Sequence, residues 1–148
     1  MTTPNKLHIL VVIADFYKHI AELQLNGATQ ALNNNNASFD IIYVTGALEI
    51  PAIIAFAAQT KKYHGYVALG CVIRGETTHY DTVASESSRG LIDLSIKKHL
   101  AIGNGILTVE NEQQALMRAD MAQLDKAGSA VIACLSVIKN FNTLRESL

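Results

Sequence analysis

The segment from Leu7 to Ala14 reads LHILVVIA and places apolar side chains on both faces of the strand that it predicts. Because side chains of a strand alternate between two faces, a run of this kind needs cover on both sides. Helices provide that cover in folds where parallel strands and helices alternate along the chain. This segment therefore favours a parallel sheet that lies between two layers of helices.

The rest of the chain continues this alternation. Strands are predicted over residues 39–44, 65–73 and 101–109. Helices are predicted over the alanine-rich residues 49–62 and over residues 82–99, 110–119 and 129–144. The recurrence of apolar residues every three or four positions is poor over 82–99 and clear over 129–144. A further helix follows the first strand, and the polar residues 33–36 predict the loop that ends it. The last helix is expected to line one face with Ala130, Ala133, Cys134, Val137, Ile138, Phe141 and Leu144.

Length and composition exclude several classes of protein. The 148 residues fit one domain, 1–148, and the 49% of apolar residues excludes a disordered chain. No apolar run approaches the roughly 18 residues that a membrane span needs. Twelve basic residues against 13 acidic ones form no basic stripe, so nucleic acid is not an expected partner. Without a signal-peptide layout, we expect a cytoplasmic protein whose Cys71 and Cys134 are buried, reduced thiols.

Ligands of open parallel sheets bind beyond the carboxyl ends of the strands. The most polar segment in such a position is RGETTHYD, residues 74–81. Its glycine, its threonine hydroxyls and the start of a helix suit a phosphate, with His79 as a proton carrier. The alternative is an ordinary turn with a helix cap, since Thr78 and Asp81 have capping-box spacing. No metal site is expected, because Glu76 and His79 have no further His or Cys at ligand spacing.

A second turn with ligand-binding potential reads TGALEIP, residues 45–51. Gly46 permits an unusual backbone angle or a close contact. Pro51 starts a helix, so the free amides of Ala47, Leu48 and Glu49 can face a ligand. The Glu49 carboxylate can accept hydrogen bonds from a ligand, or it can simply complement the helix dipole.

Two more residues, Phe16 and Arg118, each have a functional and a structural interpretation that the sequence does not separate. Phe16 follows the first strand and can stack on a flat heterocycle, or it can form a hydrophobic staple at the helix start. Arg118 ends a helix and can bind a phosphate in bidentate fashion, or it can complement the helix C-terminus.

Two motifs resemble one enzyme family in order and in spacing. The first is VALGCVIRGETTHYDTVASESSRGLIDLS, residues 67–95, and the second is GALEIP, residues 46–51. Together they resemble the 6,7-dimethyl-8-ribityllumazine synthases, and the resemblance extends over nearly the whole chain. It implies a flavodoxin-like, three-layer α/β sandwich with a four-stranded parallel sheet.

The resemblance also implies a reaction and an assembly. The family condenses 5-amino-6-(D-ribitylamino)uracil with 3,4-dihydroxy-2-butanone 4-phosphate, in the penultimate step of riboflavin biosynthesis, without cofactor or metal. Its members form homopentamers, some of which pair into decamers or build icosahedral shells. The expected partners are the small-molecule substrates, further copies of the chain, and riboflavin synthase as a candidate.

Carried over residue by residue, the resemblance divides the site in two. The residues implied to bind the pyrimidine, its ribityl chain and the pocket wall are Phe16, Ala47, Leu48, Glu49, Val72 and Ile73. Gly75, Glu76 and Thr77 would hold the phosphate, and His79 would carry protons. Arg118 would reach the phosphate from the neighbouring subunit. Lys126 matches a lysine that the family carries in this segment.

Three departures from the family pattern stand out. Asn104 replaces a phenylalanine that packs over the ring from the adjacent subunit, and Leu48 replaces a frequent aromatic residue. Residues 120–125 lack the pattern of shell-forming members, with Ala122 where a lysine often stands. We therefore expect a pentamer first, a decamer second, and no shell.

Two other functions compete with the synthase. Asn104 and Ala122 motivate a pentameric carrier that binds flavins or lumazines with little turnover. A generic nucleotide-binding module is weaker, because the chain has no Gly-x-Gly-x-x-Gly fingerprint. The excess of apolar over charged residues is expected to lie partly in subunit interfaces.

Overall fold

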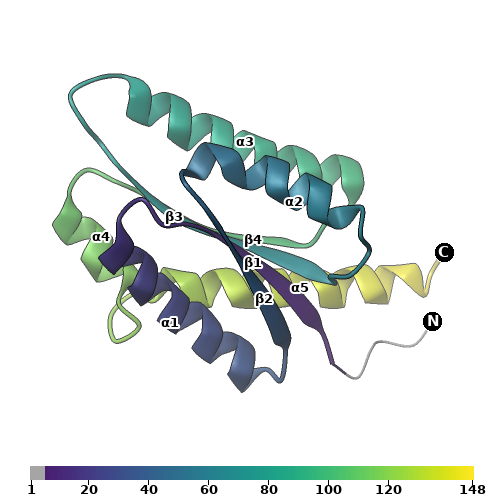
Figure 1. Cartoon of the computed structure of the whole chain (residues 1–148). Helices are drawn as coiled ribbons and strands as arrows, with labels where there is room; N and C mark the ends of the chain where they lie inside the picture. The colour runs from purple at the N-terminus through teal and green to yellow at the C-terminus, as the bar shows by residue number, and fades with distance from the viewer. Residues whose placement is uncertain (1–5) are drawn as a thin grey trace.

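The computed structural model describes residues 6–148 and has one sheet of four parallel strands in the order β2-β1-β3-β4 (Figure 1). The strands are β1 (His8–Ala14), β2 (Ser38–Val44), β3 (Gly65–Ile73) and β4 (Ile102–Val109). The helices are α1 (Lys18–Asn34), α2 (Ile50–Ala58), α3 (His79–Lys98), α4 (Glu112–Ala119) and α5 (Lys126–Arg145). A 3₁₀ turn, Ala47–Glu49, precedes α2. The predicted flavodoxin-like sandwich is confirmed.

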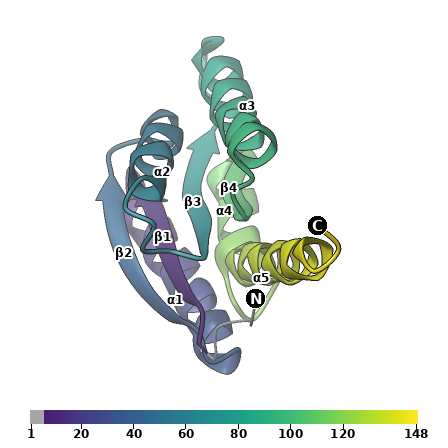
Figure 2. The same cartoon turned by 90° about the vertical axis from the view of Figure 1, so that its right-hand side faces the viewer.

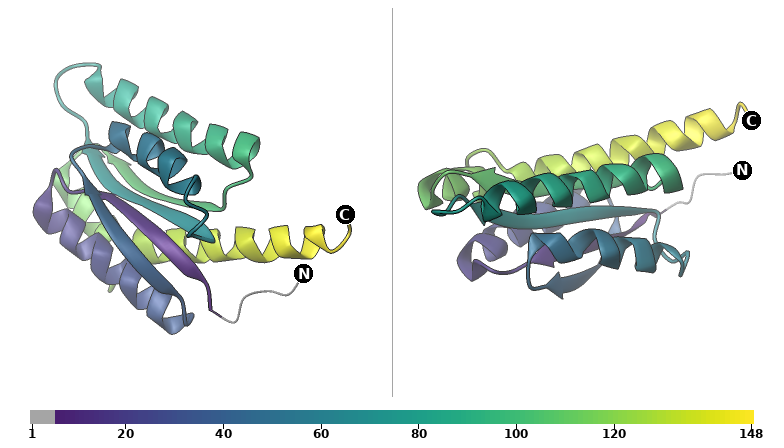
Figure 3. Two further views of the ribbon diagram at one scale, coloured as in Figure 1. Left: turned by 45° about the vertical axis from the view of Figure 1, so that its right-hand side comes forward. Right: turned by 90° about the horizontal axis from the view of Figure 1, so that it is seen from above.

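The sheet lies between two layers of helices (Figure 2). Helices α2 and α3 cover one face, and α1, α4 and α5 cover the other, as the two views of Figure 3 also show. The apolar side chains of β1 supply both cores. Ile9, Val11 and Ile13 pack toward α1 and α5, whereas Leu10 and Val12 pack toward α2 and α3. All five are fully buried, which confirms the double burial predicted for this strand.

Double burial does not extend to the edge strands. In β2, Ile42 and Tyr43 are 37% and 57% exposed. In β4, burial alternates, so that Asn104 and Thr108 are exposed while their neighbours are not. An edge strand has a neighbour on one side only, and the helices here do not reach over its full width. The edge strands are therefore less buried than their apolar residues predicted.

Some predicted helix boundaries are wrong for local reasons. Helix α1 continues through Asn34 into the predicted loop, and it ends where the Asn35 side chain donates to the Ala31 carbonyl at 2.8 Å. Asn36 then adopts a left-handed conformation with φ 55°. Helix α2 ends at Ala58, before Lys61, which has φ 57°. Left-handed conformations of this kind end helices, and Asn tolerates them well.

Helix α5 lines the sheet with one face from Ala127 to Ile138. The buried apolar side chains of this face are Ala127, Ala130, Val131, Cys134 and Ile138. The predicted face is wrong at Ala133, which is exposed, and at Leu144, which is 65% exposed. Leu144 lies in the last turns, which extend past the sheet (Figure 1). Among residues 6–148, α5 is the one helix long and apolar enough to cross a membrane by length and composition alone, and one of its faces packs in the core against the sheet.

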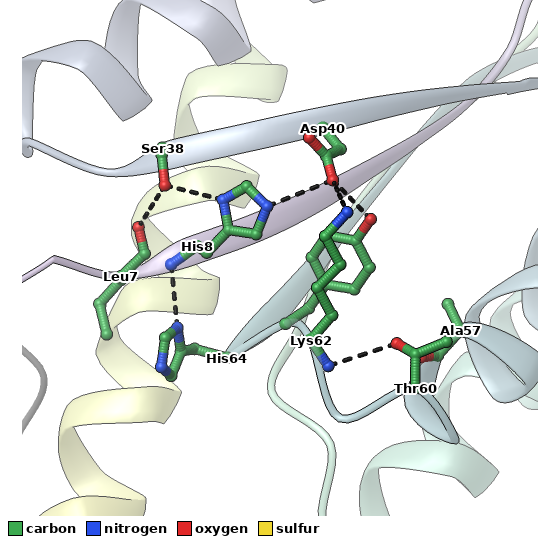
Figure 4. A network of polar contacts seen from close by, with 9 residues as sticks. Leu7, His8, Ser38, Asp40, Ala57, Thr60, Lys62 and His64 are labelled. Atoms are coloured by element: carbon green, nitrogen blue, oxygen red, sulfur yellow. Dashed lines mark hydrogen bonds and ion pairs between the residues drawn. The ribbon is translucent and has the colours of Figure 1, made fainter.

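A polar network joins the amino ends of β1, β2 and β3 (Figure 4). Asp40 accepts hydrogen bonds from the Tyr63 hydroxyl at 2.7 Å and from Lys62 at 3.0 Å, and His8 lies 3.2 Å away. These contacts, with Tyr63 the largest contributor, lower the pKa of Asp40 from 3.8 to about 2. The His8 amide also donates to Nδ1 of His64 at 2.9 Å. The network therefore ties the end of the sheet opposite the candidate site.

Candidate active site

A pocket of about 520 Å³ lies beyond the carboxyl ends of β1 and β3. The connections after these two strands leave in opposite directions, which opens a crevice between them. The pocket brings together residues from three separate segments that the sequence singled out. The predicted site residues that line it are Phe16, Ala47, Leu48, Glu49, Val72, Ile73, Gly75, Thr77 and His79.

Phe16 stands at the pocket with 72% of its surface exposed. Its ring contacts Tyr17 edge to face, with centroids 4.9 Å apart. A hydrophobic staple would bury this ring against the first turns of α1. The exposure of Phe16 therefore argues against the staple and leaves a ring face open for stacking on a flat ligand.

The turn after β2 is closed by its own side chains. The Thr45 hydroxyl donates to Oε1 of Glu49 at 3.1 Å. Gly46 is extended, with φ −144°, so the first of the two possibilities at this glycine, an unusual backbone angle, is not realised. A close contact is present instead, because a Cβ at Gly46 would lie 3.0 Å from the Glu49 carboxylate. The Glu49 amide, expected to be free, donates to the Gly46 carbonyl at 3.1 Å, since residues 47–49 form the 3₁₀ turn.

The loop from β3 to α3 presents backbone to the pocket. A Cβ on Gly75 would meet no atom within 4 Å, so this stretch of backbone is open. Thr78 precedes the helix, but its side chain makes no capping hydrogen bond, and the predicted capping box is wrong. The Thr77 hydroxyl instead accepts a hydrogen bond from the His79 amide, the first amide of α3, at 3.3 Å.

Arg74 holds the base of this loop. Its guanidinium donates to Glu110 at 2.9 Å and to Asp81 at 3.4 Å, and it lies 4.2 Å from the centre of the Tyr80 ring. Loss of hydration acts to lower the pKa of Arg74, but the carboxylates of Glu110 and Asp81 raise it on balance. Arg74 therefore stays charged and links the exits of β3 and β4 to the first turn of α3.

The two cysteines differ from expectation. Both are free thiols, and Cys134 is buried as predicted, but Cys71 is only half-buried and lines the pocket. Burial raises the pKa of Cys71 to about 11 and that of Cys134 to about 12. A thiolate is the reactive form of cysteine, so neither thiol is primed as a nucleophile at neutral pH.

Four predicted residues do not line the pocket of this chain. Glu76 is exposed in the β3–α3 loop, and Lys126 is the exposed first residue of α5. Asn104 is exposed on β4, where its side chain accepts the Ile106 amide at 3.0 Å. Arg118 is half-buried in the last turn of α4 and donates to its own helix. Between residues 6 and 148, no group of three or more His, Cys, Asp or Glu side chains is placed to hold a metal.

Besides the apolar Ala14 and Val83, sequence reasoning missed four side chains of the pocket that carry a hydroxyl or a thiol. These four are Tyr17, Thr45, Cys71 and Tyr80. Each lies beside a predicted site residue, at the end of a strand or in the turn that follows it. Their position after a strand was the signal available, but their residue types alone do not separate a pocket wall from a packed turn.

Comparison with known proteins gives one family. The sequence profile described as 6,7-dimethyl-8-ribityllumazine synthase matches residues 6–142. The enzyme of that name from Bartonella henselae is 56% identical over 90% of this chain and 88% of its own length. The enzyme of the same name from Bartonella tribocorum is 58% identical over 90% of this chain and 89% of its own length. The 6,7-dimethyl-8-ribityllumazine synthase 1 of Rhizobium meliloti is 51% identical over 94% of each chain. The chain belongs to the 6,7-dimethyl-8-ribityllumazine synthase family.

Proposed function

We propose that this chain condenses 5-amino-6-(D-ribitylamino)uracil with 3,4-dihydroxy-2-butanone 4-phosphate. The products are 6,7-dimethyl-8-ribityllumazine, one inorganic phosphate and two molecules of water. The single observation that carries this proposal is the convergence of the GALEIP turn, the RGETTHYD loop and Phe16 on one pocket. Family membership supports the same reaction.

The pyrimidine has a suitable place between apolar and polar walls. The exposed ring of Phe16 is free to stack on the heterocycle, and Val72 and Ile73 line the pocket with it. The Glu49 carboxylate, held by Thr45, can accept hydrogen bonds from hydroxyl or amino groups of the substrate. These contacts orient the ring amine for attack on the ketone, and orientation is a large part of catalysis in a condensation.

The phosphate has a suitable place at the β3–α3 loop. Gly75 leaves backbone open there, and the start of α3 favours a negative charge. His79 is the first residue of α3 and lines the same pocket, so it is placed to carry protons as phosphate leaves and the second ring closes. An anion site stabilises the charge on the leaving phosphate.

The active assembly in this proposal is a cytoplasmic homopentamer. Asn104, Arg118 and Lys126 lie outside the pocket of their own chain, and in this proposal they act in the pocket of a neighbouring subunit. Exposed apolar side chains on α2 and α3 give a neighbour a surface to cover: Phe56 is 71%, Ile92 56% and Ile96 68% exposed. Interfaces of obligate oligomers are more apolar than ordinary surface.

The test is to supply the purified protein with both substrates and follow lumazine absorbance together with released phosphate. The proposal expects both products to form at equal rates. Tight binding of lumazine or riboflavin without phosphate release would support the carrier alternative instead. Light scattering of the same sample should give a particle mass of five times the 16.0 kDa chain mass, for a pentamer. A mass of ten times this value, for a decamer, is the second expectation. A particle near a megadalton would contradict the assembly.

A further inference from the structure

Gln24 is a polar side chain in the core face of α1. Only 1% of its surface is exposed, and Ser87 is the other polar residue buried to this extent between residues 6 and 148. Ser87 satisfies its hydroxyl inside its own helix, by donating to the Val83 carbonyl. Gln24 instead reaches out of its helix to the sheet.

The amide of Gln24 joins two neighbouring strands. Its nitrogen donates to the carbonyl of Gly70 in β3 at 2.8 Å and to that of Gly105 in β4 at 3.2 Å. A primary amide carries two hydrogens, so both are used. The amide oxygen is buried with no hydrogen-bond partner among the residues described, which destabilises the folded state. An apolar residue of the same size would avoid that cost, so packing alone does not explain the amide.

One of these strands builds the wall of the candidate site. The pairing of β3 with β1 ends at Leu69, opposite Ile13, so Gly70 lies just past it. Beyond this point β4 is the remaining strand beside β3. Val72 and Ile73 follow directly and line the pocket. Gln24 therefore holds β3 at the position where it loses one neighbour and enters the site.

The other strand carries Asn104. Gly105 comes directly after it and lies beside Leu69 of β3 with no room for a side chain, because a Cβ on Gly105 would lie 2.7 Å from the Leu69 side chain. The Asn104 side chain is exposed on this strand. A change in the offset between β3 and β4 would therefore move the pocket wall and Asn104 relative to each other.

We propose that Gln24 is a positioning residue for the active site: its amide fixes the carboxyl end of β3, with Val72 and Ile73, against the Asn104 segment of β4. This inference rests on the proposed synthase activity. In the pentamer, each Gln24 then sets a wall of its own pocket and the surface that its chain offers to the next pocket. Loss of the amide loosens the pyrimidine site without removing any group that contacts the substrate.

The test compares Gln24→Met with the intact protein. Methionine keeps the length of the side chain and removes both donors. Losing about one net hydrogen bond of positioning corresponds to an about fivefold higher KM for the pyrimidine substrate, and to an equally weaker Kd for the lumazine product. The kcat should stay within about twofold, because the reacting groups remain. The Tm should stay the same or rise, since the unpartnered oxygen is gone.

Ser87→Ala is the matched control, because it removes the other buried polar group, and Ser87 bonds to the pocket residue Val83 without lining the pocket itself. It should lower the Tm and leave KM and Kd unchanged. Gln24→Leu repeats the test should the methionine variant fail to fold. Unchanged KM and Kd in a folded Gln24 variant would overturn the inference. It would also be overturned if the variant had a lower Tm and a smaller fraction of active protein, but bound the substrate with the normal KM. Absent turnover in the unmodified protein would contradict the proposed function, and the product Kd would still decide the role of Gln24.

Discussion

The Thr45 hydroxyl donates a hydrogen bond to Oε1 of Glu49 over 3.1 Å, across the turn that leads from β2 into α2. Among the described residues that line the pocket, Glu49 has the one carboxylate. Its orientation therefore depends on a neighbour four positions earlier in the chain. The contact also explains why this turn is compact, since Gly46 leaves just enough room beside the carboxylate.

Replacing Thr45 with valine tests this contact. The shape of the side chain is kept, while the hydrogen bond, of about 0.5–1.5 kcal/mol, is lost. We expect a two- to tenfold rise, roughly, in KM for the pyrimidine substrate, with little change in kcat, measured by steady-state kinetics. Thr143→Val is the control, because Thr143 bonds only within α5, near the far end of that helix. Equal kinetics for both variants would show that Glu49 needs no such support.

His79 and Arg118 should fail in different ways. His79→Ala removes a proton carrier and should lower kcat by at most the ~10²–10⁴ typical of acid–base catalysis. Arg118→Ala removes charge-assisted hydrogen bonds worth about 1.5–3 kcal/mol, and should mainly raise KM for the phosphorylated ketone. Arg145→Ala, near the end of α5, is the control. If neither His79→Ala nor Arg118→Ala changes turnover, the roles assigned here are wrong.

The Asp40 network predicts an acid-sensitive contribution to stability. Hydrogen bonds from Tyr63 and then Lys62 and His8 lower the Asp40 pKa to about 2 in the folded chain, from 3.8. A lowered folded-state pKa stabilises the protein above pH 3.8, and this stabilisation is lost as the pH falls toward 2.

Asp40→Asn should therefore flatten the acid limb of a plot of stability against pH, measured by circular dichroism in denaturant. Asp93→Asn is the control, because Asp93 pairs with Arg89 within one exposed helix face. A profile for Asp40→Asn that runs parallel to that of the unmodified protein below pH 4 would contradict the prediction.

Much of the fold could be predicted from patterns that depend on the chain alone. The strand over residues 65–73 has the predicted limits, because its apolar run is bounded by a glycine and a charged loop. Phe16, Glu49 and His79 were predicted to lie near one another because the carboxyl ends of parallel strands share one edge of the sheet. That inference needs topology and no detailed packing.

Other features depended on three-dimensional neighbours. Glutamine is a polar residue that usually lies at the surface, and only the hydrogen bonds of Gln24 to the Gly70 and Gly105 carbonyls explain its burial. Thr78 was the predicted cap of α3, but its side chain makes no capping hydrogen bond, and the path of the loop brings the Thr77 hydroxyl to the His79 amide instead. Leu144 fits an apolar helix face, but the sheet ends before it.

Mixing two defective chains tests the central claim, a lumazine synthase site built from two neighbouring subunits. His79→Ala and Arg118→Ala chains are unfolded, combined in equal amounts and refolded, and lumazine formation is compared with that of each variant refolded alone. In randomly mixed rings about a quarter of the sites regain both residues, so turnover should rise well above that of either variant. Turnover equal to the average of the two variants would contradict the claim, because it would mean that each site draws on a single chain.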